Sequence, residues 1–372
     1  MKLKHWTAAD IGKGTRVLVR LDVNVPVKRG QVQDGGAFGR IAQALPEIEA
    51  LRKRGARIIL AAHLGDPGGK VVKSLSLGPV AKVLATKLKR VVPLVTAWED
   101  LPELRPGGLC LLENLRFDPG EEKNDDAFAW KLAKLADVYV NNAFGVCHRR
   151  HASVHAVTRH LPSFAGELVR REVEELSAKP VKPFVLVMGG AKIATKINVL
   201  RELGPKADKI LLGGGLAVTF LAAADVALPA YPADLMQPAD VAVARKLLRQ
   251  FGRKLVMPVD LVAKPKSHLI TDIGPETIQA FLEHLAPART IIWNGPLGII
   301  ERPDGQAGTL AVTAGMLNGD ARTITGGGET VTFLDDHKLI KGFTHVSTGG
   351  GAMLAFLAGE ALPGLVAIQD RD

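Results

Sequence analysis

Arginine and histidine side chains recur in the first half of the chain, just after short apolar runs. The charged and polar residues concerned are Asp22, Asn24, Arg40, His63, Arg116 and Arg149. Guanidinium groups hold phosphate and carboxylate through paired hydrogen bonds, so convergence of these side chains would bind a small, multiply charged anion. A carboxylated phosphoester is the expected ligand. Taken singly, each arginine could instead form a surface ion pair, and His63 could be a structural residue.

Glycines occupy the equivalent positions in the second half of the chain. They are Gly189 and Gly190, Gly213 to Gly215, Gly295 and Gly298, Gly326 to Gly328, and Gly349 to Gly351. Backbone N–H groups at such glycines can approach a phosphate, and a helix that begins there directs its positive end at the anion. Glu329 follows one of these runs and could hold the magnesium ion that accompanies a nucleotide. The pattern predicts a nucleotide site, although the glycines could also form only tight turns.

Two lysines follow the first glycine pair of this half. Lys192 and Lys196 have i, i+4 spacing, which places both ammonium groups on one side of a helix start. There they could neutralise a phosphoryl group during its transfer, and the alternative is a solvated helix face. The chain contains neither the GxxxxGK[ST] P-loop nor the GxGxxG dinucleotide fingerprint, so these two common classes of nucleotide site are excluded.

The elements that position these residues are predicted from the spacing of apolar side chains. Short buried strands are expected at residues 16–22, 56–62, 109–112, 138–141, 183–188, 209–212, 254–258, 290–293 and 322–325. Helices are expected between them, at 41–53, 79–88, 126–135, 239–250 and 275–284. This alternation predicts a doubly wound α/β fold with parallel sheets, in which ligands bind at the carboxyl ends of the strands.

Composition restricts the class of protein. The 372 residues suffice for two domains, and 47% hydrophobic with 23% charged residues is typical of globular proteins. The net charge of +10 favours anionic ligands, whereas an aromatic content of 5% is poor for stacking on nucleic acid, so no nucleic-acid partner is expected. Cys110 and Cys147 have no disulfide or metal-site spacing. The sequence shows neither a signal-peptide pattern nor an apolar run of membrane-spanning length, so we expect a cytoplasmic protein.

One amphipathic stretch separates the arginine-rich half from the glycine-rich half. Residues 164–176 have the apolar spacing of a helix, and Lys179 and Pro180 follow them. We therefore expect an N-terminal domain at residues 1–163, a connecting helix and linker at 164–182, and a C-terminal domain that begins at residue 183.

Segments in order along almost the whole chain resemble the phosphoglycerate kinase family. They are RLDVNVP (20–26), HLG (63–65), ENLRF (113–117), NNAFGVCHRRHAS (141–153), GGAK (189–192), GGGLAVTF (213–220), PVD (258–260), DIGPET (272–277), WNGPLG (293–298), GGGET (326–330) and HVSTGGGA (345–352). The resemblance implies two Rossmann-like doubly wound parallel-sheet domains that face a cleft and are joined by an interdomain helix. It also implies that the C-terminal domain spans residues 183–352 and that a tail at 353–372 returns to the N-terminal domain.

The same resemblance implies an enzyme, a phosphotransferase with a carboxyl group as acceptor. Its glycolytic reaction would be the reversible transfer of a phosphoryl group between 1,3-bisphosphoglycerate and Mg-ADP, giving 3-phosphoglycerate and ATP. A monomer that closes by hinge motion is implied, with Mg²⁺ and ATP or ADP bound, and with neither nucleic acid nor a membrane as partner. Two alternatives remain, a paralogue that phosphorylates a different small carboxylic acid and a catalytically weak nucleotide-binding regulatory protein with the same fold.

The resemblance implies a role for individual residues, position by position. The catalytic groups would be Arg40, Lys192 and Lys196. The N-terminal domain would bind phosphoglycerate through Asp22, Val23, Asn24, Arg40, His63, Leu64, Gly65, Asp66, Arg116 and Arg149. The C-terminal domain would bind the nucleotide through Gly190, Lys196, Gly213, Gly214, Asn294, Glu301, Gly326, Gly327, Gly328, Glu329 and Thr330, with Glu329 also as the metal ligand.

The chain departs from the family pattern at several of these positions. Asp66 stands where the family has an arginine, which places a negative charge at the expected substrate phosphate. Arg150 replaces an alanine, Glu329 and Asn142 each replace an aspartate, and the loop at residues 34–40 is longer than usual. The Asp66, Arg150 and loop differences are the reason why a paralogue with another substrate stays among the alternatives.

Overall fold

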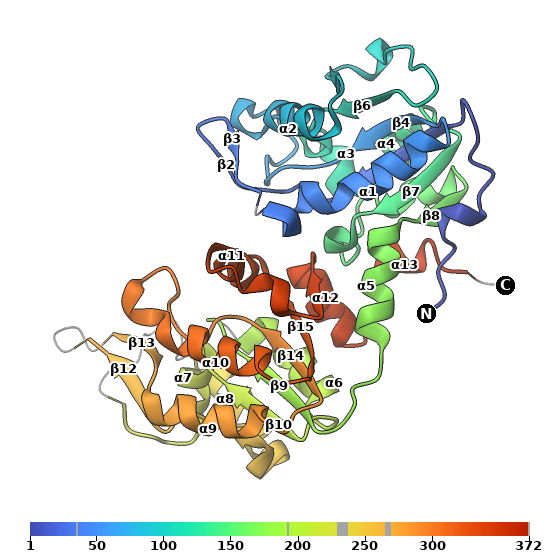
Figure 1. The fold of residues 1–372 in the computed structure, drawn as a ribbon. Helices are drawn as coiled ribbons and strands as arrows, with labels where there is room; N and C mark the ends of the chain where they lie inside the picture. Colours follow the sequence, from blue (N-terminus) through green and yellow to red (C-terminus); the bar gives the residue numbers. More distant parts are fainter. Residues whose placement is uncertain (35, 192, 229–236, 265–268, 371–372) are drawn as a thin grey trace. The chain divides into compact units, whose positions relative to one another are not determined.

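The computed structural model describes residues 1–34, 36–191, 193–228, 237–264 and 269–370. It divides into two compact units, Met1–Ser177 with Ala361–Asp372 (unit 1) and Ala178–Glu360 (unit 2). Each unit contains a six-stranded parallel sheet with helices around it (Figure 1). In the described part of the chain, no helix is long and apolar enough to cross a membrane.

Unit 1 is built on a sheet with the strand order β5-β6-β4-β1-β7-β8. Its strands are β1 (Arg16–Leu21), β4 (Arg57–Ala61), β5 (Leu94–Val95), β6 (Leu109–Leu112), β7 (Val138–Asn142) and β8 (Ser163–Ala165). Val17 and Val19 of β1 pack into a core on one face of the sheet, and Leu18 packs into a core on the other. A strand that is buried on both faces needs a nearly continuous apolar sequence, which RVLVRL provides.

Helices cover both faces of the unit 1 sheet. They are α1 (Arg40–Lys53), α2 (Gly78–Leu88), α3 (Pro119–Glu122), α4 (Asp126–Ala133), α5 (Glu167–Ser177) and α13 (Pro363–Val366). Apolar side chains of α1 and α2 share a core with Val17, whereas those of α4 share a core with Leu18 on the opposite face. The unit is doubly wound, as the sequence predicts.

Unit 2 repeats this architecture with the strand order β11-β10-β9-β14-β15-β16. The strands are β9 (Phe184–Met188), β10 (Lys209–Leu212), β11 (Leu255–Val256), β14 (Thr290–Asn294), β15 (Arg322–Gly326) and β16 (His345–Ser347). All neighbouring strands in this sheet run parallel. The two sheets confirm the predicted fold class, although β11 is shorter than the strand expected at residues 254–258.

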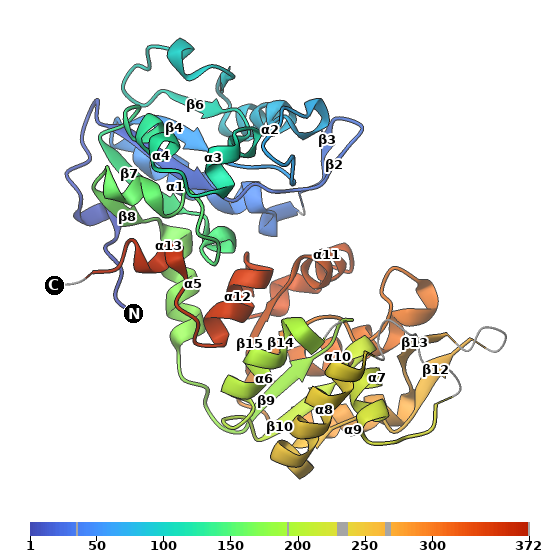
Figure 2. The same ribbon diagram turned by 180° about the vertical axis from the view of Figure 1, so that it is seen from behind.

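The helices of unit 2 also lie on both faces of its sheet. They are α6 (Ile197–Leu203), α7 (Gly214–Ala223), α8 (Pro238–Phe251), α9 (Pro275–Leu285), α10 (Ala307–Leu317), α11 (Gly328–Asp336) and α12 (Gly350–Leu357). Helices α9 and α10 lie before the sheet in Figure 1, and α7 and α8 lie before it in Figure 2, which views the molecule from behind. Among the described residues, short antiparallel strand pairs lie outside the main sheets, β2 (Val27–Lys28) with β3 (Gln31–Val32) in unit 1 and β12 (Leu261–Ala263) with β13 (Ile270–Ile273) in unit 2.

The helix expected at residues 164–176 begins three positions later than its apolar spacing indicates. Phe164 belongs to β8, where it pairs with Val140 of β7. Asn142, at the end of β7, accepts a hydrogen bond from the N–H of Leu168 at 2.9 Å and so caps the first turn of α5. Pairing with a strand that is distant in sequence therefore decides where this helix starts.

The C-terminal segment packs against the N-terminal part of unit 1. The N–H of Gly364 donates to the carbonyl of Cys147 at 2.9 Å, and a Cβ at Gly364 would lie 3.0 Å from the Cα of Cys147. Asp370 forms an ion pair with Lys2 at 3.0 Å. Because α12 continues to Leu357 and packs on α6, the change from unit 2 to unit 1 falls at residue 361 instead of 353.

Candidate active site

The polar residues predicted in the first half all lie at one edge of the unit 1 sheet. They follow the carboxyl ends of β1 (Asp22, Asn24), β4 (His63, Asp66), β6 (Arg116) and β7 (Arg149), and Arg40 opens α1. The strand order reverses beside β1, since β4 lies on one side of it and β7 on the other. Doubly wound sheets bind ligands at this point because the loops on the two sides diverge and leave a crevice.

Arg40 is held at this edge by the loop that follows β1. Its Nη1 donates to Asp22 Oδ1 at 2.8 Å and to the backbone oxygen of Asn24 at 3.1 Å. Asp34 accepts a hydrogen bond from the N–H of Ile41 at 3.2 Å and caps the start of α1. The longer loop at residues 34–40 thus leaves the guanidinium of Arg40 in contact with the predicted site.

Hydrogen bonds between side chains and backbone groups join the loops that follow β1, β4 and β6. Asn24 Oδ1 accepts from the N–H of Gly65 at 2.9 Å, and Arg116 Nη1 donates to the carbonyl of Gly65 at 2.8 Å. Gly65 has φ +61°, a conformation that other residues seldom adopt. The side chains of Val23 and Leu64 are buried in the core, so only their backbone atoms can face a ligand.

His63 contacts a buried arginine that sequence reasoning missed. Arg20 Nη2 lies 3.1 Å from His63 Nδ1, and Arg20 Nε donates to Ser153 Oγ at 2.8 Å. Ser153 in turn donates to Glu121 Oε1 at 2.6 Å, and Glu121 lies 4.0 Å from Arg20. The signal that could have revealed this network is Arg20 itself, a charged residue between the apolar residues Val19 and Leu21 of the strand RVLVRL.

Burial and neighbouring charges keep His63 neutral. Burial is the larger cause and the positive charge of Arg20 the next, and together they hold the pKa of His63 well below its ordinary value of 6.5. Because a guanidinium only donates hydrogen bonds, Nδ1 of His63 accepts from Arg20 and Nε2 carries the proton. His63 is therefore a hydrogen-bond donor that does not change its charge near neutral pH.

Arg116 and Arg149 supply the cationic character of this edge. Arg116 is buried and forms ion pairs with Asp66 and, at 3.3 Å, with Glu122. Its pKa is lowered mainly by burial, and the charge of the exposed Arg149 lowers it further. Arg150 acts instead on the pKa of His155, which it lowers together with burial. Nothing in these contacts gives Arg150 a part in the cationic site.

Burial and the same cations hold another histidine neutral. The pKa of His151 is lowered to about 4, mainly by burial and then by the charge of Arg116. His151 Nδ1 lies 3.9 Å from Glu121 Oε1. The site therefore presents arginine charges and neutral imidazoles, an arrangement suited to a phosphate or carboxylate ligand.

In unit 2 the glycine-rich loops cross at the equivalent point of the sheet, between β9 and β14. The N–H of Gly190 donates to the carbonyl of Pro296 at 2.7 Å, that of Gly214 to Leu297 at 2.8 Å, and that of Gly213 to Met188 at 3.0 Å. A Cβ at Gly189 would lie 2.6 Å from the carbonyl oxygen of Gly295. The expectation that these N–H groups are free for a phosphate is wrong for Gly190, Gly213 and Gly214, because the loops use them to pack together.

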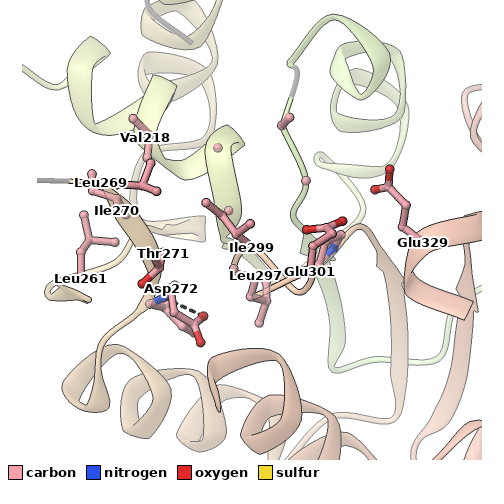
Figure 3. A pocket seen from close by; sticks show the side chains of 17 residues that line it. Val218, Leu261, Leu269, Ile270, Thr271, Asp272, Leu297, Ile299, Glu301 and Glu329 are labelled. Carbon is pink, nitrogen blue, oxygen red and sulfur yellow. Dashed lines mark hydrogen bonds between the residues drawn. The ribbon is translucent and has the colours of Figure 1, made fainter. Parts of the chain in front are cut away.

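A pocket of about 470 Å³ opens beside this crossing (Figure 3). Its walls include Gly190, Gly214, Val218, Leu261, Leu269, Ile270, Leu297, Ile299, Glu301 and Glu329. Figure 3 shows the apolar side chains of Val218, Leu261 and Leu269 at one end and the carboxylates of Glu301 and Glu329 at the other. This distribution suits a ligand with a flat apolar part and a polar part, such as a nucleoside.

Asp272 also lines this pocket, but its carboxylate is already bound by backbone groups. It accepts from the N–H of Ile273 at 2.9 Å and from the N–H of Gly308 at 2.7 Å. Burial is the main cause that raises its pKa, and these two hydrogen bonds oppose the rise. We assign Asp272 a structural role in holding β13 against α10.

Two helices begin close together at the carboxyl ends of β15 and β16. Helix α11 starts at Gly328 and α12 at Gly350, and a Cβ at Gly350 would lie 3.2 Å from the Cα of Gly327. Asn294 Nδ2 donates to the carbonyl of Gly326 at 2.7 Å and fixes this turn. A second depression of about 450 Å³ is lined by Asn294, Gly327 and Gly350. The N-terminal ends of two helices here favour an anion. The glycine run at the second of them was noted in the sequence, but its residues were not among the predicted nucleotide-binding residues.

Lys196 lies beside the same loops. It is buried at the start of α6, and a Cβ at Gly190 would lie 3.2 Å from its Nζ. Burial lowers the pKa of Lys196, and the negative charge of Glu329 partly restores it. Lys192, predicted to act with Lys196, falls outside the described residues.

Glu329 fits the role of a magnesium ligand only together with a nucleotide. Its carboxylate is exposed in the first turn of α11 and faces the pocket. Among the described residues, no cluster of three or more His, Cys, Asp or Glu side chains could hold a metal ion. Mg²⁺ is commonly bound by one carboxylate, water and nucleotide phosphates, and this donor set needs no further protein ligand.

Comparisons with known proteins agree over nearly the full length of the chain. The sequence model of the phosphoglycerate kinase family matches residues 8–360. The phosphoglycerate kinase of Moorella thermoacetica is 44% identical, with 96% of each chain covered, and that of Roseiflexus sp. (strain RS-1) is 41% identical, covering 96% of this chain and 97% of the relative. The solved structure of the enzyme from Pyrococcus horikoshii OT3 matches 99% of this chain and 98% of its own with a TM-score of 0.89 at 30% identity. That from Coxiella burnetii matches 98% of both chains with a TM-score of 0.85 at 34% identity.

Proposed function

This chain belongs to the phosphoglycerate kinase family, and from that premise we propose that it transfers a phosphoryl group reversibly between 1,3-bisphosphoglycerate and Mg-ADP. The products are 3-phosphoglycerate and ATP. The observation that carries the proposal is that the two units hold different kinds of site. Unit 1 has an arginine cluster at one edge of its sheet, and unit 2 has a pocket with one apolar end beside the starts of two helices. The alternatives of another acid or a weak binding protein are not favoured, because relatives with this one activity match the full length.

In the proposed arrangement, unit 1 binds the phosphoglycerate. Arg116, Arg149 and the Nε2–H of His63 bind its phosphate, because the two guanidinium groups supply charge and the neutral imidazole supplies a hydrogen bond. Asp22 and Asn24 hold the hydroxyl group. Val23, Leu64 and Gly65 contribute backbone atoms, and Arg40 faces the reacting carboxylate. The counterions Asp22 and Asp66 keep the arginines in place when the site is empty.

Unit 2 binds the nucleotide in the same proposal. The apolar end of the pocket takes the base, and Glu301 accepts hydrogen bonds from the ribose. The phosphates lie at Gly326, Gly327 and Gly328, with Asn294 and Thr330 supporting this turn and with Gly190, Gly213 and Gly214 shaping the opposite wall. Glu329 would hold Mg²⁺ together with the phosphates, and the ion would supply positive charge to them.

Catalysis in this family is positioning and charge neutralisation, and the residues are suited to it. A carboxylate oxygen of 3-phosphoglycerate forms a bond to the γ-phosphorus of ATP while the bond to ADP breaks, so no proton has to move. The ammonium of Lys196, together with Lys192 and Arg40, neutralises charge on the transferring group. Because Lys196 is buried, its charge is screened less than a surface charge would be. We also propose a cytoplasmic monomer, as the family resemblance implies.

The test is an assay of the purified chain with 3-phosphoglycerate and Mg-ATP, in which the product is reduced by a coupled dehydrogenase. We expect turnover, and we expect Arg40→Met to abolish it while the protein remains folded by circular dichroism. Turnover only with another small acid would establish the paralogue, and nucleotide binding without any turnover would establish the regulatory protein. Either result would contradict the proposed function.

A further inference from the structure

The guanidinium of Arg116 is already occupied by carboxylates. Its Nη1 contacts Asp66 Oδ1, and its Nε lies 3.3 Å from Glu122 Oε1. The Arg116 side chain is only 2% exposed and also donates to the carbonyl of Gly65 at 2.8 Å, so it has little freedom to turn towards another partner. A ligand that approaches Nη1 of this arginine therefore meets a carboxylate that is already there.

The two carboxylates differ in how easily they can leave. The side chain of Asp66 is 76% exposed, whereas that of Glu122 is 34% exposed. An exposed carboxylate keeps most of its hydration and loses little free energy when its ion pair opens. Asp66 is thus the partner that a ligand can replace, and Glu122 is the one that stays.

Arg116 is stabilised by a carboxylate partner when no ligand is bound. Burying a guanidinium is costly, and burial lowers the pKa of Arg116, a change that the charge of Asp66 opposes more than that of Glu122 does. The neighbouring cations Arg20 and Arg149 increase this cost, because they act on Arg116 with the same sign of charge. A carboxylate that pairs with Arg116 while no ligand is bound therefore stabilises the cationic cluster.

We propose that Asp66 is a resident counterion of Arg116, which holds the position of the substrate phosphate in the empty site and is displaced when the phosphate binds. The inference rests on the proposed function in placing that phosphate at Arg116. Displacement imposes the same cost on every phosphate ligand. Phosphoglycerate offsets the cost of displacing Asp66 through further contacts at Arg40 and Asn24. Free inorganic phosphate lacks the groups that make those contacts, so Asp66 keeps small anions out of the site.

The experiment measures binding without turnover. Titration calorimetry of the full chain with 3-phosphoglycerate and, separately, with inorganic phosphate is carried out in a phosphate-free and sulfate-free buffer of fixed ionic strength. Asp66→Asn removes the charge and keeps the size of the side chain. We expect the Kd of both ligands to fall by the same factor, about two- to fivefold, since both displace the same carboxylate. Asp66→Ser is a second variant that removes the group altogether.

A matched control separates this local effect from net charge. Asp10 is an exposed carboxylate of unit 1 that makes no contact with Arg116 in the described structure, and Asp10→Asn changes the net charge equally. An equal gain in Asp10→Asn would reduce the effect to net charge and overturn the inference. Unchanged or weaker binding in both Asp66 variants, or no phosphate binding at millimolar concentration in any variant, would overturn it as well. If the Asp66 variants bind inorganic phosphate more tightly but do not bind 3-phosphoglycerate, the result would instead count against the proposed function alone.

Discussion

Glu47 on α1 is a buried carboxylate whose ionisation should make the stability of unit 1 depend on pH. Its side chain lies in the core, and its Oε2 accepts a hydrogen bond from the N–H of Glu167, the first residue of α5, at 3.1 Å. Burial raises its pKa from 4.5 to about 7, although the hydrogen bond from Glu167 opposes the rise. The native state therefore holds this proton more tightly than the unfolded chain does.

The sign and size of the effect follow from this difference. The group's contribution to stability is fully present below pH 4.5, and it is lost as the pH rises towards about 7. At about 1.4 kcal/mol for each pH unit, the interval corresponds to about 3 kcal/mol. Glu47→Gln keeps an oxygen that can accept the Glu167 N–H and removes the titration. The quantity to compare is the free energy of unfolding of the variant minus that of the unsubstituted protein. We expect this difference to be about 2 kcal/mol more favourable to the variant at pH 8 than at pH 5.

Urea unfolding at the two pH values, followed by circular dichroism, measures this difference. Glu49→Gln on the same helix is the control, because the ion pair with Arg52 lowers the pKa of Glu49 and gives the opposite sign. Removing the Glu49 carboxylate should therefore not increase the free energy of unfolding at pH 8. The reasoning is refuted if Glu47→Gln changes the free energy of unfolding equally at pH 5 and pH 8, or if it destabilises the protein more at pH 8.

Three further predictions concern the glycine-rich unit and the thiols. Lys196→Met should lower kcat roughly 100-fold with little change in KM for Mg-ATP, measured by steady-state kinetics, because its charge acts mainly in the transition state. A shift in KM alone would make Lys196 a ground-state contact. Gly213→Ala should destabilise the protein by about 1–3 kcal/mol in urea unfolding, since its Cβ would lie 3.0 Å from the backbone of Leu297, whereas Gly319→Ala, whose Cβ meets open space, should be nearly neutral. Burial raises the pKa of both cysteine thiols to about 12, so a disulfide reagent at pH 8 should label them only on unfolding, and rapid labelling of the native chain would contradict this.

The sequence alone determined the fold class and the sheet edge at which the candidate site residues lie. Strands such as RVLVRL are apolar on both faces because helices cover both sides of the sheet, and this pattern is visible without coordinates. Parallel strands place their carboxyl ends at one edge, so Asp22, His63 and Arg116 could be expected at the same edge of the sheet although they are far apart in the chain. Local chemistry and periodicity carry this information.

The hydrogen-bond partners of the site residues were decided only by the tertiary structure. The charge of Asp66 by itself predicts repulsion of a phosphate, but its contact with Arg116 makes it a counterion. Arg20 was missed because its role depends on Ser153 and His63, which are distant in sequence.

The glycine loops and the start of α5 show the same limit. The run at Gly213 and Gly214 predicts free N–H groups, yet these groups bind carbonyls of other loops. The apolar spacing of residues 164–176 predicts a longer helix, but pairing of Phe164 with β7 and the cap from Asn142 delay its start. Apolar periodicity repeats along a single segment, so the sequence displays it. A hydrogen bond or ion pair instead depends on which two segments meet, and only the folded chain determines that.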